Sequence, residues 1–411
     1  IRPPWQIEWI CLMSFFLLSA NFTDALSSAF GYLNTGHHTV VEATTFVGLL
    51  LGGVFIPMPV SLGLTRLVVG RAGHLWGMVL FSGALVVSHS SIILCELNFM
   101  EVSVQQTAFV IARFIAGIGS GILFQARFVL VSLSTEDHHL DLQARSFLAS
   151  DLGLGIGALL PWCAALLAGN AELSRLSPNL PSSSILAIMS FLLLVWVLVS
   201  FPRRLHRLPS SVRFREVTHE DKPPRAKTSK KPRWVLLFSG TTRIFVQTAG
   251  VITLALWMRD YGFVGNFRQT AAAAGLCLLP VPCEALAASS TSQRNRRFTR
   301  YIAVLAVLVV VVLFVFGHLA YWPEDGGFRV ALVAAEQASL LVALAFAAPA
   351  NVSRLYQAGD LEESLVILEW LKAYIGRLLG PAFAIVIQNW LGYGPLLLAL
   401  CTATVAVALT A

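Results

Sequence analysis

Twelve long apolar runs divide the chain, and they limit the folds that it can adopt. Each run has about the 20 residues that a helix needs to cross the hydrocarbon core of a bilayer. Charged residues make up only 12% of the sequence, about half of their share in soluble domains. We therefore expect an all-α membrane protein with 12 transmembrane helices. The runs cover residues 8–32, 39–62, 74–95, 104–132, 145–169, 184–201, 234–257, 270–290, 301–322, 329–350, 365–388 and 393–411.

A basic segment separates the sixth run from the seventh. Residues 202–233 carry eleven Lys and Arg residues against three acidic ones. The segment is too polar and too often interrupted by proline to build a core, so it is predicted to be a linker. The predicted domains are an N-terminal six-helix lobe at 1–201, the linker at 202–233 and a C-terminal six-helix lobe at 234–411.

Positive charges between the runs gather on one side of the predicted bundle. If successive spans alternate in direction, the linker lies on the same side as Arg66, Arg71 and a group of arginines between 294 and 300. Cytoplasmic loops carry such an excess of Lys and Arg. Both termini and the linker are therefore predicted to be cytoplasmic, in a membrane whose type the sequence does not indicate. This sidedness accounts for the net charge of +7, so no nucleic-acid partner is expected.

Catalytic and metal-binding patterns do not stand out in the sequence. The six cysteines lie in or at the ends of apolar runs, where cysteine acts as a small hydrophobic residue. The paired histidines have no third ligand nearby to suggest a metal. No Ser/His/Asp grouping, phosphate-binding glycine loop or redox motif is evident. We expect neither an enzyme nor a bound metal or cofactor.

The outline of six spans, a cytoplasmic linker and six more spans resembles the major facilitator superfamily. The fourth run strengthens this resemblance, because Arg113 is followed by Gly117, Gly119 and Gly121 at the spacing that many members carry there. Small residues let a neighbouring helix approach closely. The resemblance implies two six-helix bundles around a central cavity. It also implies alternating access, in which the lobes rock around a site near the midplane.

Two further motifs resemble those of the superfamily. Between spans 2 and 3, Arg71 and Gly73 match the usual loop pattern, although Gly70 stands where an acidic residue is usual. Spans 5 and 11 resemble the glycine and proline pattern of antiporter members, and we assign these residues a role in helix packing or conformational change. The residues of this second motif are Gly157, Pro161, Gly380 and Pro381.

Intramembrane charges are the candidates for function, because a charge near the bilayer centre is costly unless it serves a pathway, a partner or a substrate. Asp24, Arg113, Arg243 and Glu336 lie about mid-span in spans 1, 4, 7 and 10. The resemblance implies that these spans line the cavity. Asp24 and Glu336 are expected to take protons. The substrate-binding candidates are Arg113, Arg243, Gln247, Asn21 and Gln337.

Other intramembrane charges have local explanations. Arg127 is expected to reach the interface or to pair with Glu136. Glu369 and Lys372 are three residues apart, so they can pair with each other. Glu284 is interpreted as an acidic residue at the membrane boundary. Asp151 and Arg377 are further intramembrane candidates that we leave without a role.

These observations predict a secondary active transporter of a small polar solute, working as a monomer in a lipid bilayer. Two mid-span arginines favour an anionic or zwitterionic solute, and the buried carboxyl groups could couple transport to protons, by symport or antiport. If Asp24 and Glu336 neutralise the arginines, a facilitative uniporter of a neutral solute such as a sugar fits as well. A non-transporting receptor or scaffold of the same family remains a further alternative.

Overall fold

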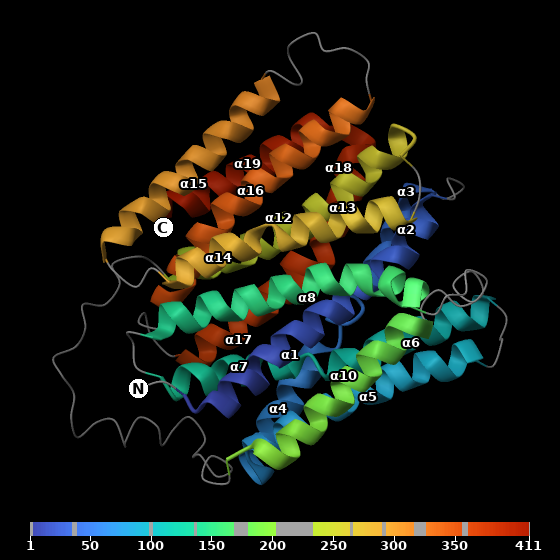
Figure 1. Ribbon diagram of the computed structural model, residues 1–411, viewed down its shortest axis with the longest axis vertical. Coiled ribbons are helices and arrows are strands. Elements are labelled where there is room, and N and C mark those ends of the chain that lie inside the picture. Colours follow the sequence, from blue (N-terminus) through green and yellow to red (C-terminus); the bar gives the residue numbers. More distant parts are fainter. Residues whose placement is uncertain are drawn as a thin grey trace.

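The structure is a computed structural model that describes most of the chain. The described residues are 3–34, 39–97, 102–134, 138–167, 180–202, 233–263, 266–289, 293–315, 326–355 and 361–410. Within these ranges the protein is a bundle of helices with no β-strand (Figure 1). This architecture confirms the predicted all-α fold.

The helices fall into two sets along the chain. The first set, here called the N-terminal half, consists of α1 (Trp5–Asp24), α2 (Leu26–Asn34), α3 (Val40–Gly52), α4 (Met58–Ala72), α5 (His74–Leu97), α6 (Val102–Ile118), α7 (Gly121–Ser132), α8 (His139–Leu167) and α10 (Leu180–Ser200). The second set, the C-terminal half, consists of α12 (Arg233–Asp260), α13 (Asn266–Leu278), α14 (Pro280–Ser289), α15 (Gln293–Phe314), α16 (Gly326–Leu355), α17 (Leu361–Leu371), the π-helix η4 (Lys372–Leu379), α18 (Gly380–Leu391) and α19 (Tyr393–Thr410).

Each predicted apolar run coincides with helical structure. Nine helical stretches among the described residues are long and apolar enough to cross a membrane, and three shorter apolar helices match the remaining runs. Several spans are broken into two helices, which the runs did not show. The breaks lie at Ala25 in span 1, at 53–57 in span 2 and at 119–120 in span 4.

The structure corrects two predicted loops. Arg66 and Arg71 lie in α4, and the whole connection to α5 is Gly73, whose backbone has a positive φ of 89° that glycine adopts without strain. The arginines from 294 to 300 belong to the first turns of α15, which begins eight residues before the apolar run at 301. The linker prediction falls outside the described residues, apart from Pro202 and Arg233 at its ends.

The first and last helices reach the same end of the bundle. Figure 1 shows the N and C marks on the same side of the molecule. The end at which α10 stops and α12 begins is called the linker end below, and the other is called the far end. A chain that crosses the membrane an even number of times has both ends on the same side. The assignment of the linker end to the cytoplasm stays a prediction.

Helix α8 packs closely against both halves because of its three glycines. A side-chain carbon on Gly153 or Gly157 would collide with the backbone of Phe16 or Ala20 in α1. A carbon on Gly155 would collide with Leu278 of α13, on the opposite side of α8. Small residues permit such contacts between helices in a membrane. The glycines therefore place α8 between α1 and the C-terminal half.

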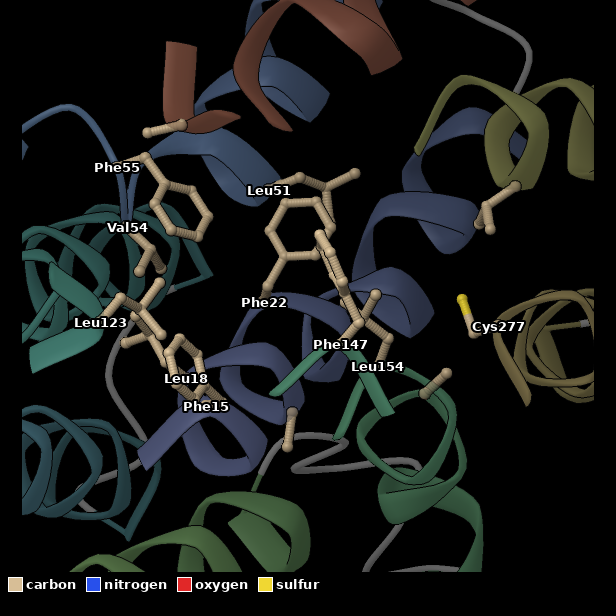
Figure 2. Close-up of a cluster of buried hydrophobic side chains, with 14 of the residues drawn as sticks. Phe15, Leu18, Phe22, Leu51, Val54, Phe55, Leu123, Phe147, Leu154 and Cys277 are labelled. Atoms are coloured by element: carbon tan, nitrogen blue, oxygen red, sulfur yellow. The ribbon is translucent and has the colours of Figure 1, made fainter. Parts of the chain in front are cut away.

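A hydrophobic cluster fills the space where α8 meets the helices of spans 1, 2 and 4. Figure 2 shows side chains from α1, from the end of α3, from α7 and from α8 gathered there, with Cys277 of α13 beside them. Phe22 and Phe55 pack with ring centroids 5.8 Å apart. The outer surface is also apolar, with side chains such as Val199 and Trp390 more than 70% exposed. Such a surface requires lipid around it.

Candidate functional site

Arg113 lies in α6 and is fully buried in the N-terminal half. Its guanidinium group donates to the side-chain and main-chain oxygens of Asn21, the former at 2.8 Å. It also donates to the carbonyl oxygens of Phe22 at 3.1 Å and of Leu50 at 3.2 Å. Asn21 and Phe22 lie in the last turn of α1, and Leu50 lies in the last turn of α3. Arg113 thus binds the C-terminal ends of two broken helices.

This geometry gives Arg113 a clear structural task. The last carbonyl groups of a helix lack partners within the helix, and in a membrane an unsatisfied carbonyl costs several kcal/mol. A cation at these ends also interacts favourably with the helix dipoles. Asp24, at the end of α1, is buried next to Ser182 and within electrostatic range of Arg113. Because all three guanidinium nitrogens donate within one half, the predicted substrate contact of Arg113 remains a prediction.

Arg243 lies in α12 and joins the two halves. One of its terminal nitrogens, Nη2, donates to Asp151 Oδ2 of α8 at 2.5 Å and also to Glu284 Oε1 of α14. Gln247, one turn later in α12, donates to Asp151 Oδ1 at 3.2 Å. Arg243 and Gln247 are four residues apart and share a helix face, which explains why both reach Asp151. Arg243, Asp151 and Glu284 are all buried, with 1% exposure or less.

A second ion-pair group joins the halves nearer the linker end. Glu369 Oε1 of α17 forms an ion pair with Arg127 Nε of α7 at 2.7 Å, and it accepts a hydrogen bond from Lys372 Nζ at 3.2 Å. Arg127 also donates to Gln143 of α8. The local pairing predicted for Glu369 and Lys372 is confirmed. The interpretation of Arg127 as an interfacial arginine is wrong, because it is 4% exposed and bound to Glu369.

Phe147 of α8 connects the two groups. The guanidinium carbon of Arg243 lies 4.0 Å from the centre of its ring, and Lys372 Nζ lies 4.9 Å from it. Arg127 is within 5.9 Å of the same ring. An aromatic face attracts cations and keeps water away from them. We call Phe147 and the charged residues around it the interhalf cluster: Arg127, Asp151, Arg243, Glu284, Glu369, Lys372 and Arg377.

Arg377 joins this cluster from η4. It is buried within electrostatic range of Asp151 and Glu369, and its guanidinium carbon lies 4.6 Å from the ring centre of Phe55. The π-helical winding of η4 brings Lys372, Tyr374 and Arg377 to the N-terminal half, where Tyr374 donates to the carbonyl oxygen of Ile56 at 2.8 Å. Short π-helical segments are frequent at functional sites.

Glu336 and Gln337 of α16 lie elsewhere in the C-terminal half. The hydroxyl group of Tyr393 donates to Glu336 Oε2 at 2.6 Å, and Gln337 Nε2 approaches the same hydroxyl oxygen at 3.4 Å. Both residues are buried. The structure thus places the four mid-span charges in three environments, with Asp24 near Arg113 and with Arg243 and Glu336 apart from them. Neither Asp24 nor Glu336 forms an ion pair with Arg243 among the described contacts.

The sequence missed part of the interhalf cluster. Glu284 was expected at the membrane boundary, and this interpretation is wrong, since Glu284 is fully buried beside Arg243. Asp151 had no assigned role, although a lone carboxylate inside an apolar span is itself a signal that it has a partner. Span 8 breaks at Leu279, directly before Pro280, and Glu284 lies in the second of its two helices, α14.

The halves are closed onto each other at both ends. At the far end, Asn34 of α2 and Gln269 of α13 exchange side-chain hydrogen bonds of 2.8 and 3.2 Å, and the rings of Trp162 and Phe267 stack with centroids 4.6 Å apart. A cavity of about 10 Å³ remains between the halves beside Thr23 and Gln247. This space holds about one water molecule. The structure therefore represents a closed arrangement.

The glycines of the span 4 motif lie where neighbours come close. A side-chain carbon on Gly117 would lie 2.7 Å from Pro57 Cδ, and one on Gly121 would lie 2.6 Å from Thr65 Oγ1. One on Gly380 would collide with Thr248 of α12, and Pro381 is buried directly after it. Pro161 lies inside α8 near its far end. These positions fit close packing, and their role in conformational change remains a prediction.

The model of the major facilitator superfamily matches residues 8–361. The chain belongs to the major facilitator superfamily. This is a family of transporters, so the expectations of a multi-pass membrane protein that moves a small solute, and of no enzyme, are confirmed at that level. No curated protein sequence matches the chain.

Solved transporter structures share the fold at low sequence identity. The E. coli xylose transporter XylE, in a partially occluded inward-open conformation, has a TM-score of 0.67 at 15% identity, over 98% of this chain and 96% of the other. A D-xylose-proton symporter has a TM-score of 0.69 at 14% identity, over 98% and 96%. The human organic anion transporter MFSD10 has a TM-score of 0.62 at 14% identity, over 99% of both chains. At such identities the likeness shows the fold alone.

Proposed function

We propose that this transporter carries a small anionic or zwitterionic solute by secondary active transport, and that the solute binds in the interhalf cluster. One observation carries the proposal. Three buried cations surround Phe147, and a fourth, Arg377, lies beside Phe55 within electrostatic range of Asp151 and Glu369. These cations face three carboxylates, which leaves a positive charge in excess when all are ionised. Uncompensated buried charge is costly. An acidic group of the solute would complete the pairing.

The location of the cluster fits alternating access. Arg127 and Asp151 belong to the N-terminal half, whereas Glu369 and Arg243 belong to the C-terminal half. If the halves rock as lobes, the bonds between them break and both sets of charges face an aqueous cavity. The solute's carboxylate or phosphate would then take the place of Glu369 or Asp151 against the freed cations. Arg127 and Arg243 offer the fork of donors that such groups prefer.

The predicted substrate contacts divide between the cluster and its surroundings. Arg243 and Gln247 lie in the cluster. Asn21 and Gln337 are buried in separate environments, bound to Arg113 and next to Tyr393. Contacts of the solute with Arg113, Asn21 and Gln337 would require a change in these bonds. We therefore place the main binding energy at Arg127, Arg243 and Lys372, with lipid as the surrounding medium and a monomer as the working unit.

A neutral sugar is the second candidate, and the ion pairing favours it. Arg127, Arg243 and Lys372 are each bound to a carboxylate already, so the cluster can hold its charges without an anionic solute. The structural relatives include both a xylose transporter and an organic anion transporter. A uniporter would take up the sugar without a gradient, and a receptor or scaffold would take up nothing.

Tracer uptake into proteoliposomes separates these candidates. The full chain would be tested with organic anions, amino acids and sugars, beside Lys372→Ala and the control Arg259→Ala, which alters an ion pair with the exposed Asp260. We expect uptake of an acidic solute, with the half-saturation concentration raised about tenfold or more in Lys372→Ala, since losing a buried charge contact costs 2 kcal/mol or more. Uptake restricted to sugars would contradict the anionic assignment. No uptake in any arm would support the receptor alternative.

A further inference from the structure

The π-helix η4 interrupts the α-helical winding of span 11 between α17 and α18. In a π-helix each N–H group bonds to the carbonyl group five residues earlier, whereas in an α-helix it bonds to the one four residues earlier. A shift of one residue in this pattern corresponds to a rotation of about 100°, since an α-helix has 3.6 residues per turn. The winding of η4 therefore sets the direction in which the side chains of α17 face relative to α18.

Pro381 leaves one carbonyl group of span 11 without a partner in the helix. In the π pattern the N–H group of residue 381 would donate to the carbonyl oxygen of Gly376, but proline has no N–H group. In the α pattern the unpaired carbonyl group would be that of Arg377 instead. Both residues are buried, and an unsatisfied carbonyl group is costly in a membrane. A donor to Gly376 therefore favours π-helical winding over α-helical winding.

Thr248 of α12 supplies this donor. Its hydroxyl group donates to the carbonyl oxygen of Gly376 at 2.7 Å. The hydroxyl oxygen also lies 3.0 Å from the carbonyl oxygen of Ile244 and 3.2 Å from that of Phe245, both in its own helix. A hydroxyl group has one hydrogen to donate, and Gly376 is the nearest of the three acceptors. Gly380 permits the approach, because a side-chain carbon there would collide with Thr248 Oγ1.

The π-helical winding places side chains of η4 against the N-terminal half. Lys372 Nζ lies 4.9 Å from the ring centre of Phe147, and Tyr374 donates to the carbonyl oxygen of Ile56 at 2.8 Å. Helix α18 is packed against α12 at Gly380. A change to α-helical winding would therefore turn α17 and the start of η4, and Lys372 would leave the face of Phe147.

We propose that Thr248 is a positioning residue for solute binding. Its bond to the Gly376 carbonyl group holds η4 in the π-helical register, and this register places Lys372 in the interhalf cluster. The proposal rests on the proposed function, because the solute binds to the cations of that cluster. Thr248 also borders the small cavity between the halves, so the experiment has to separate positioning from a direct contact with the solute.

The first measurement is tracer uptake into proteoliposomes, with the half-saturation concentration and the maximal rate determined separately. Thr248→Val removes the hydroxyl group at nearly constant volume. We expect it to raise the half-saturation concentration about fivefold or more, which corresponds to about 1 kcal/mol, and to change the maximal rate about twofold or less. Thr248→Ser keeps the hydroxyl group and should behave as wild type. Thr253→Val is the matched control, because Thr253 is a buried threonine of α12 that donates to Ala249 in its own helix.

Pro381→Ala distinguishes the two roles of the hydroxyl group. The new N–H group can donate to the carbonyl oxygen of Gly376 and so replace the hydroxyl group of Thr248. When it is combined with Thr248→Val, the half-saturation concentration should return to within about twofold of the value for Pro381→Ala alone, as expected for two coupled positions. A hydroxyl group that bound the solute directly would not be replaced by a backbone donor in another helix.

Spin labels report the register of η4 without any solute. Labels on the exposed residues Trp370 of α17 and Leu67 of α4 should give a changed distance in Thr248→Val. Thr253→Val should keep the wild-type distance, and Thr248→Val combined with Pro381→Ala should restore it. If the wild type takes up no solute, the proposed function fails, and these distances still decide whether Thr248 sets the register.

Four results would overturn the proposal. Thr248→Val with the half-saturation concentration of wild type would show that the bond to Gly376 is not needed for binding. A defect that Pro381→Ala does not rescue would assign the hydroxyl group to the solute. An unchanged label distance in Thr248→Val would show that the register does not depend on Thr248. Loss of folded protein in Thr248→Val that persists in the combination with Pro381→Ala would assign Thr248 to stability alone.

Discussion

Arg113 and Arg243 are equally buried arginines with opposite kinds of partner. Arg113 donates to backbone carbonyl groups and to Asn21, all within the N-terminal half. Arg243 donates to carboxyl groups that belong to both halves. A carbonyl group cannot change its charge, and partners in one half do not separate when the halves move. The partners of a buried charge, rather than the charge itself, therefore distinguish a structural site from one that can drive transport.

The largest effect that we expect is the loss of folded protein in Arg113→Leu. The change leaves the carbonyl groups of Asn21, Phe22 and Leu50 without a donor, at several kcal/mol for each group in a membrane. The yield of monodisperse protein after size-exclusion chromatography measures this effect, with Arg66→Leu on the exposed side of α4 as control. If the Arg113→Leu variant folds normally and has lost only solute binding, Arg113 is a binding residue and the structural role assigned to it is wrong.

Arg243→Leu should be less damaging, and it should be rescued by a second change. Removing one partner of a buried ion pair costs about 3 to 5 kcal/mol. Removing both charges in Asp151→Leu with Arg243→Leu should recover most of that loss, since a buried pair is often no better than an apolar replacement. Thermal unfolding of the single and double variants in detergent measures the coupling. A double variant as unstable as the sum of its parts would show that the pair is not an interacting unit.

Glu369→Gln should shift the equilibrium between closed and open arrangements at the linker end. Arg127 and Lys372 lose the carboxylate that joins α7 to α17, and coupling energies of this kind are about 1 to 3 kcal/mol. Spin-label distances between α7 and α17 should therefore gain a longer component. An unchanged distance distribution would mean that other contacts hold this end closed.

Asn34→Ala should also shift the equilibrium from the closed toward the open arrangement, at the far end and by a smaller amount. The Asn34 and Gln269 bonds are neutral, and such a bond contributes about 0.5 to 1.5 kcal/mol. Labels on α2 and α13 would show a small increase in the open population. A larger effect here than in Glu369→Gln would contradict the view that the charged end dominates the closed state.

The fold followed from the sequence because transmembrane helices are selected for length and hydropathy alone. All twelve runs coincide with helices. Arg113 and the three glycines that follow it identified the fourth run as span 4 of the superfamily. The break at Ala25 and the π-helical segment η4 were not predicted, since no proline or glycine in the sequence marks the break at Ala25 and π-helical winding has no simple sequence pattern. The break at Leu279 was overlooked, although Pro280 follows it directly.

The site was predicted less completely, for a related physical reason. Position along a helix gives the depth of a residue, and depth singled out Arg113 and Arg243. The direction in which a side chain points depends on rotation and on breaks, which decide that Glu284 meets Arg243 and that Arg127 meets Glu369. Sequence reasoning explained Glu284 and Arg127 by nearby charges in the chain, whereas their partners are 41 and 242 residues away.

The central claim is that Arg243 serves transport, whereas Arg113 is structural. Uptake by the variant that carries both Asp151→Leu and Arg243→Leu tests this claim most directly. Asp151→Leu with Arg243→Leu removes the ion pair that joins α8 to α12 across the halves, and it leaves Arg113 and its carbonyl partners in place. The uptake rate of the solute that wild type accumulates would be measured with the double variant at matched amounts of folded protein. We predict that uptake is lost although thermal stability is close to that of wild type. Uptake at the wild-type rate would show that the Arg243 site, like that of Arg113, is structural.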